Sequence, residues 1–79
     1  MRSVHLKITG KVQGVFFRAS AQKQALELHL TGWVRNSGDF VEAVVSGSGT
    51  DVAFFIEWAH IGPERARVQQ VEVTEMPYQ

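Results

Sequence analysis

The pair Gly38-Asp39 joins two strand-like stretches, residues 31–37 and 40–46, and constrains the fold more than any other feature of the chain. A Gly-X pair suits a two-residue type II′ turn, which fixes the register of the strands that it connects. In that register Arg35 lies opposite Glu42, as a pair of opposite charges. The other face of the hairpin then carries apolar residues: Val34, Val41, Ala43 and Val45. We expect that face to contact the core. A register shift of one residue would move every side chain to the opposite face, so the apolar face favours this register.

The stretch before the hairpin predicts one strand and one helix. Residues 3–9 alternate between apolar and polar side chains, which is typical of a half-buried strand. Gly10 is expected to open a loop that runs to Gly14. From about Val15 to Leu28 the apolar positions recur every three or four residues, which predicts a helix with one apolar stripe.

The stretch after the hairpin predicts a second helix and a last strand. Ser48 and Asp51 have the spacing of a capping box ahead of an apolar run, and Gly62-Pro63 is a typical helix end. A strand is expected from about Ala66 to Thr74. A bulge or irregular entry is expected before Val71, because the preceding apolar residue is three positions away instead of two.

The order of elements is therefore strand, helix, strand, strand, helix, strand. This order predicts an α+β fold, the ferredoxin-like βαββαβ sandwich, in which two helices cover one face of a four-stranded antiparallel sheet. With 79 residues, the chain has room for a single domain spanning residues 1–79.

Composition excludes several classes of function. The chain has no cysteine, so it can form neither a disulfide framework nor a thiolate metal site. Its 8 basic and 8 acidic residues balance, which argues against a nucleic-acid or anionic-membrane partner. No apolar run approaches the roughly 20 residues of a membrane span, and no signal peptide is visible. We expect a soluble, cytoplasmic monomer without a membrane or nucleic-acid partner.

The first helix departs from the usual rules at its start. No Ser, Thr, Asp or Asn precedes it, and no Asp or Glu occupies its first two turns. Free backbone N–H groups and a positive dipole end favour an anion at such a place. The sequence supplies a glycine-bearing loop and Arg18 there, which together could cradle a phosphate. The alternative is a loop capped by water, with Arg18 on the solvated surface.

Topology adds Asn36 to this candidate site. The first two strands are parallel in the expected fold, with the third between them, so their carboxyl ends meet at one edge of the sheet roughly 10 Å apart. Asn36 lies at the end of the second strand, on the face that the helices cover. It either serves a site there or bonds nearby backbone as a turn-initiating Asn.

Other candidate residues fit structural roles better. His5, His29 and His60 lack paired metal-ligand spacing, and no serine has suitable triad partners. The second helix is expected to place its aromatic residues in the core: Phe54, Phe55 and Trp58. Trp33 is expected on the open face of the sheet, partly covered by its neighbours.

Two separated segments of the chain resemble the signature pair of the acylphosphatase family. These are Gly10-Lys11-Val12-Gln13-Gly14-Val15-Phe16-Phe17-Arg18 and Gly32-Trp33-Val34-Arg35-Asn36. The stretch from Gly62-Pro63 to Ala66-Arg67-Val68 also resembles the carboxyl-terminal part of the family. The resemblance covers nearly the whole chain, and the family's fold agrees with the one derived from the pattern.

The resemblance implies an activity and a site. The activity is hydrolysis of acyl phosphates to a carboxylate and inorganic phosphate, with no metal and no organic cofactor, and inorganic phosphate is expected to inhibit. The loop that wraps the phosphate with its backbone N–H groups corresponds to Gln13, Gly14, Val15, Phe16, Phe17 and Arg18. By the same resemblance, Arg18 binds the phosphate oxygens and Asn36 orients the attacking water.

Two departures from the family pattern concern the end of the first helix and the hairpin after Asn36. His29 stands where glycine is usual at the end of the first helix, a place where left-handed backbone is common. The hairpin after Asn36 is about one residue shorter than in many relatives, and Ser37 is the residue that follows Asn36.

Two other functions stay open: an RNA-binding module that uses Trp33 and Phe40 on the open sheet face, and a phosphate-binding domain without turnover.

Overall fold

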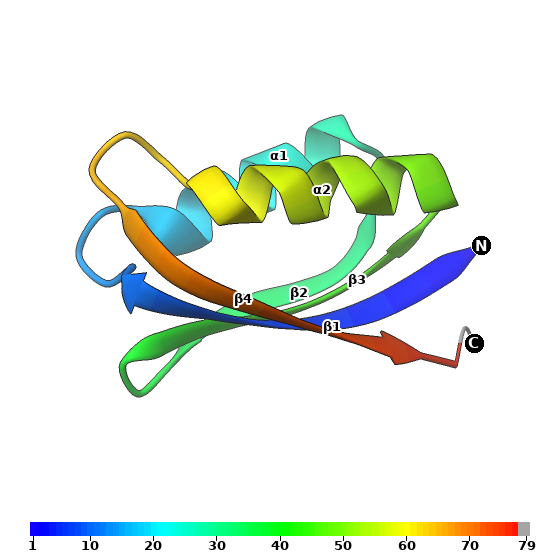
Figure 1. The fold of residues 1–79 in the computed structure, drawn as a ribbon. Coiled ribbons are helices and arrows are strands. Elements are labelled where there is room, and N and C mark those ends of the chain that lie inside the picture. The colour runs from blue at the N-terminus through cyan, green and yellow to red at the C-terminus, as the bar shows by residue number, and fades with distance from the viewer. Residues whose placement is uncertain (78–79) are drawn as a thin grey trace.

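A computed structural model describes residues 1–77, and the last two residues of the expected domain lie outside the described residues. The elements follow the order β1 (Arg2–Lys11), α1 (Phe17–Glu27), β2 (Thr31–Ser37), β3 (Phe40–Gly47), α2 (Gly49–Ile61) and β4 (Arg67–Met76). The strands form one antiparallel sheet in the order β2-β3-β1-β4. Both helices cover the same face of this sheet (Figure 1). The predicted ferredoxin-like βαββαβ sandwich is confirmed.

The β2–β3 hairpin has the predicted register throughout. Ser37 pairs with Phe40, and Arg35 pairs with Glu42. Gly38 has a φ of 65° whereas Asp39 keeps a negative φ, as a type II′ turn requires. The predicted core face of β3 is buried: Val41, Ala43 and Val45.

The core lies between the sheet and the helices. Val4, Leu6 and Ile8 of β1 are fully buried and contact the apolar face of α2, which contributes Val52 and Phe55. The capping of α2 is as predicted, because Ser48 Oγ accepts a hydrogen bond of 3.1 Å from the Asp51 N–H. The helix ends at Ile61, and Gly62 follows with a φ of 70°.

Three predicted details are wrong. The first helix begins at Phe17 instead of Val15, because Phe16 has left-handed backbone angles that interrupt the helix there. β1 continues to Lys11, so Gly10 lies within the strand and does not open the loop. Phe54 is 55% exposed, because the residue next to Phe55 on a helix points about 100° away from it.

The bulge predicted in the last strand is present, and its position matters for the site. Thr9 pairs with Gln70, whereas Gly10 pairs with Val68, so Gln69 is the extra residue. A Cβ on Gly10 would lie 2.2 Å from the Arg67 carbonyl oxygen, so glycine permits this close approach of the two backbones. Beyond the bulge, Lys11 pairs directly with Arg67.

Candidate active site

The loop of residues 12–16 lies at the end of β1, at the same end of the molecule as the β2–β3 turn and the connection from α2 to β4 (Figure 1). Buried and exposed residues alternate in it. Val12 and Val15 are buried and so is Phe17 after them, whereas Gly14 and Phe16 are exposed. The Gln13 side-chain amide donates a hydrogen bond of 3.1 Å to the Phe40 carbonyl. The loop is thus held by apolar anchors and a cross-link to β3, which fixes its backbone.

Phe17 joins the loop to the second helix. Its ring is 1% exposed and lies against Trp58, with 5.3 Å between ring centroids. A Cβ on Gly62 would come within 2.6 Å of the Phe17 ring, so the end of α2 closes directly over it. The start of α1 is therefore positioned by the core and by α2.

The start of α1 is uncapped, as predicted. Phe16 occupies the N-cap position with φ 61° and ψ 28°, its side chain is 80% exposed, and the first turn contains no acidic residue. Left-handed backbone at a residue other than glycine is strained, and such strain is concentrated at functional sites. Within residues 1–77, the N–H groups of residues 13–19 have no hydrogen-bond acceptor. These groups are available to an external anion or to water.

A small hollow of about 180 Å³ lies between this helix start and the end of β2. Its lining consists of Val12, Gly14, Phe16, Phe17, Arg18, Ala19 and Asn36. Arg18 and Asn36 thus meet at one hollow although they come from different elements. Both are exposed, and neither side chain has a hydrogen bond or ion pair with the described part of the chain.

The predicted site residues divide into two groups. Gly14, Phe16, Phe17 and Arg18 line this hollow with Asn36, whereas Gln13 and Val15 line a second hollow that also touches Gly14. Sequence reasoning missed two lining residues, Val12 and Ala19. For Ala19, a signal was available in the sequence: it is a small residue that directly follows Arg18 in the uncapped first turn.

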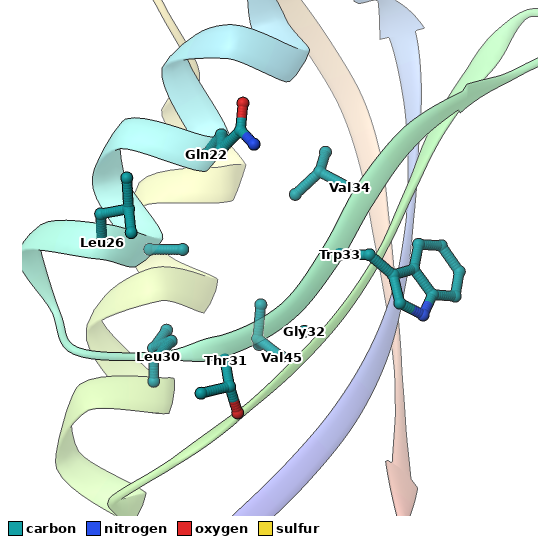
Figure 2. A pocket seen from close by; sticks show the side chains of 9 residues that line it. Gln22, Leu26, Leu30, Thr31, Gly32, Trp33, Val34 and Val45 are labelled. Carbon is teal, nitrogen blue, oxygen red and sulfur yellow. The ribbon is translucent and has the colours of Figure 1, made fainter.

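A hollow of about 340 Å³ lies elsewhere, between α1 and β2, and has a different character. Leu26 of α1 and Leu30, which precedes β2, are among its lining residues, and its lining contains no charged residue. Figure 2 shows Val34 pointing from β2 toward Gln22 of the helix, while Trp33 points to the opposite side of the strand. This apolar hollow lacks the groups that bind an anion.

Two of the three histidines, His5 and His60, have structural partners. His5 Nε2 lies 2.6 Å from Glu42 Oε2, and Arg35 Nη2 lies 2.8 Å from Glu42 Oε1. The hydrogen bonds from His5 and Arg35 hold the pKa of the Glu42 carboxyl below its usual range. His60 donates to the Ile56 carbonyl. Residues 1–77 contain no group of three His, Cys, Asp or Glu side chains arranged to hold a metal ion.

The aromatic residues of the open sheet face are paired with cations. The Arg35 guanidinium lies 4.7 Å from the ring centroid of Trp33, which is 43% exposed, so the expected partial cover is present. The Lys7 ammonium lies 4.7 Å from the centroid of Phe40. These rings are engaged with neighbouring side chains of the sheet, and nothing in their arrangement favours the RNA-binding alternative. No helix among the described residues is long and apolar enough to span a membrane.

Comparison with known sequences identifies the family of this chain. The acylphosphatase family model matches residues 4–79. The acylphosphatase of Marinobacter nauticus is 51% identical over 74 residues, which cover 92% of this chain and 80% of that protein.

Solved structures lead to the same family. The acylphosphatase of Coxiella burnetii superimposes with a TM-score of 0.95 at 42% identity, over 99% of this chain and 83% of that one. The acylphosphatase of Bacillus subtilis superimposes with a TM-score of 0.95 at 32% identity, over 100% of this chain and 89% of that one. The sequence match and the fold together show that this chain belongs to the acylphosphatase family of hydrolases.

Proposed function

We propose that the hollow beside Arg18 and Asn36 binds the phosphoryl group of an acyl phosphate and that the chain hydrolyses it there to a carboxylate and inorganic phosphate. One observation carries this proposal. The N–H groups of residues 13–19 have no acceptor among residues 1–77, and the hollow they adjoin is lined by Arg18 and Asn36.

In this proposal the phosphoryl oxygens are bound by backbone and side-chain donors together. The loop N–H groups and the positive end of α1 attract negative charge, and an arginine can donate two parallel hydrogen bonds to a phosphate. Arg18 is suited to this role because the described chain offers its guanidinium no carboxylate partner. Donors fixed before the substrate arrives stabilise charge in the transition state without reorganisation.

Asn36 is proposed to position the attacking water. An amide both accepts and donates hydrogen bonds, so it can hold a water in one orientation without changing its own charge. Phosphoryl transfer proceeds through a loose transition state, for which positioning and charge stabilisation supply most of the catalysis. Asn36 would supply the positioning, and Arg18 with the loop would supply the stabilisation.

The leaving group needs no acid from the protein. The water oxygen bonds to phosphorus while the bond from phosphorus to the acyl oxygen breaks, and its electron pair leaves with the carboxylate. The conjugate acid of that carboxylate has a pKa of about 4, so it departs as an anion at neutral pH. One proton of the water is transferred to the phosphoryl oxygens, so that an acyl phosphate dianion and water give one carboxylate and dihydrogen phosphate.

The test is hydrolysis of benzoyl phosphate by the purified chain in the presence of EDTA. We expect turnover, with competitive inhibition by inorganic phosphate. Asn36→Ala should lower kcat by about 10²–10³ while phosphate binding is largely retained, whereas Arg18→Ala should weaken both. Phosphate binding without hydrolysis would select the domain without turnover instead. Wild-type activity in either variant would exclude the proposed roles.

The monomeric state and the cytoplasmic location of the protein stay predictions.

A further inference from the structure

A second hollow, of about 540 Å³, adjoins the proposed phosphate site on the other side of the loop. It is lined by loop residues 13–15 and by Lys11, Glu64, Arg65 and Arg67. Gly14 lines both hollows, so they share a wall. A substrate bound beside Arg18 could therefore extend over the loop at Gly14 into this second space.

The charge of this second hollow is unusual for the chain. The whole chain is neutral, yet four of its eight basic residues line the two adjoining hollows, together with only one acidic residue, Glu64. The basic residues are Lys11, Arg18, Arg65 and Arg67. Charges of one sign gathered in a cleft raise the local concentration of an oppositely charged ligand.

Lys11 and Arg67 lie directly opposite each other on β1 and β4. Like charges in this position destabilise a sheet. Neither side chain has a carboxylate within ion-pair distance among residues 1–77, and the Arg67 guanidinium donates only a long bond of 3.5 Å to the neighbouring Ala66 carbonyl. An arrangement that opposes stability without internal compensation is expected where a ligand is bound.

The sheet order indicates which part of a substrate would reach this hollow. Asn36 is on β2 at one edge of the sheet, Arg67 is on β4 at the other edge, and the loop leaves β1 between them. In phosphoryl transfer the attacking and leaving oxygens are roughly in line. If Asn36 holds the water, the acyl part therefore leaves on the side of β4.

We propose that Lys11, Arg65 and Arg67 bind a second anionic group, a carboxylate or a phosphate, on the acyl part of the substrate. This inference rests on the proposed function, because it takes the position of the phosphoryl group from it. The enzyme then favours acyl phosphates whose acyl part is itself negatively charged over neutral ones of the same size.

The experiment compares two rigid substrates that differ in one charge, 4-carboxybenzoyl phosphate and 4-carbamoylbenzoyl phosphate. We expect kcat/KM to be about tenfold higher for the carboxylate, and this ratio to fall as salt is added, since exposed charges are screened. The double variant R65Q/R67Q should bring the ratio close to one. 4-Phosphonobenzoyl phosphate distinguishes the two anions, because a larger preference for it indicates a phosphate group as the natural ligand.

Lys23→Gln is the matched control, because it removes one positive charge from α1 at a position that lines neither hollow. It should leave the ratio unchanged. Lys11→Gln is the second variant should the double variant fail to fold, and it should lower the ratio without lowering the urea midpoint, since it relieves the repulsion with Arg67. A wild-type ratio near one, or a ratio that these variants leave unchanged, overturns the proposal. Failure to hydrolyse either substrate overturns the proposed function instead.

Discussion

The two helices cover the same face of one sheet but begin in opposite ways. At the start of α2, Ser48 Oγ accepts a hydrogen bond from the Asp51 N–H, and the Asp51 carboxyl complements the dipole of the first turn. At the start of α1, Phe16 offers no side-chain cap and the first turn holds Arg18 in place of an acid. The first arrangement satisfies the helix internally, whereas the second leaves its first N–H groups without an acceptor among residues 1–77.

The helix ends differ as well. α2 is followed by Gly62, whereas α1 is followed by His29, whose φ is 57°. The Leu30 N–H bonds to the Ala25 carbonyl and the His29 N–H to the Leu26 carbonyl, which is the Schellman pattern. The end of α1 thus has a common hydrogen-bond pattern, and what is unusual there is a histidine in the left-handed position that glycine normally occupies. The position of α1 depends on the buried Phe17 and on α2, so its start needs no cap of its own and is open to the proposed phosphate.

The largest expected effect comes from placing an acidic residue in the first turn of α1, where α2 has one. Ala19 is exposed and occupies the third position of α1, as Asp51 does in α2. In Ala19→Glu, the new carboxylate should repel the phosphoryl group and lower kcat/KM for benzoyl phosphate by about 10²–10³. The same carboxylate should leave the free energy of unfolding unchanged or raise it by about 0.5 kcal/mol, because it complements the helix dipole.

Ala19→Gln is the control for size at this position. It should retain much more activity than Ala19→Glu, since it adds bulk without charge. Equal losses in the two variants would mean that crowding, not the open positive start of α1, explains the effect.

Removing the cap of α2 should affect stability alone. Ser48→Ala leaves the Asp51 N–H without its acceptor, so urea unfolding should show a loss of about 1 kcal/mol. Because Ser48 lines neither hollow at the start of α1, kcat/KM for benzoyl phosphate should not change. Ser48→Asp keeps a capping oxygen and should restore most of the stability. A large loss of activity in Ser48→Ala would contradict the separation of the two helix starts.

The features that local periodicity and turn chemistry determine could be predicted from the sequence. The hairpin register follows from Gly38-Asp39 and the alternation on either side, and the α2 cap follows from the spacing of Ser48 and Asp51. The unusual start of α1 was predictable because the expected capping residues are absent there. The meeting of Arg18 and Asn36 followed from the topology of the fold.

Two of the three errors concern residues whose position depends on distant contacts, whereas the exposure of Phe54 follows from the local geometry of the helix. Val15 is an apolar anchor of the loop, and its hydrophobicity does not distinguish it from a first helical residue. β1 extends to Lys11 because it pairs with Arg67 beyond the bulge, and that partner is 56 positions away in the sequence. The basic hollow depends on this pairing and could not be predicted from local pattern.

The end of α1 offers a smaller test of the same contrast. Left-handed backbone destabilises a residue with a Cβ by roughly 1–2 kcal/mol relative to glycine. Part of this advantage of glycine is offset, because glycine has more conformational entropy to lose from the unfolded state. His29→Gly should therefore raise the free energy of unfolding by about 0.5–1 kcal/mol without changing kcat/KM. His29→Ala removes the imidazole but keeps the Cβ, so it should not stabilise. If both variants stabilise equally, the imidazole and not the backbone angle is the cause.

The smallest expected effect lies on the opposite face of the sheet, which neither helix covers. There His5 and Arg35 lower the pKa of the Glu42 carboxyl, so the folded state binds this proton more weakly than the unfolded state does. The resulting stabilisation is present above the unfolded pKa of about 4.3 and is lost as the pH falls through the lower folded value. Glu42→Gln should thus lower the urea midpoint at pH 7, by less than Ser48→Ala does. The difference from wild type should shrink as the pH falls below about 4.3 toward the lowered pKa of the folded carboxyl, which then becomes protonated.

Glu57→Gln is the matched control for this pH dependence, because Glu57 is exposed on α2 and has no ion-pair partner among residues 1–77. It should change the midpoint little at either pH. Glu42→Gln should also leave kcat/KM for benzoyl phosphate unchanged, since Glu42 lines none of the hollows near the loop. A deficit that persists undiminished at low pH would show that Glu42 stabilises the sheet through packing or neutral hydrogen bonds, because a contribution from its charge must disappear when the carboxyl is protonated.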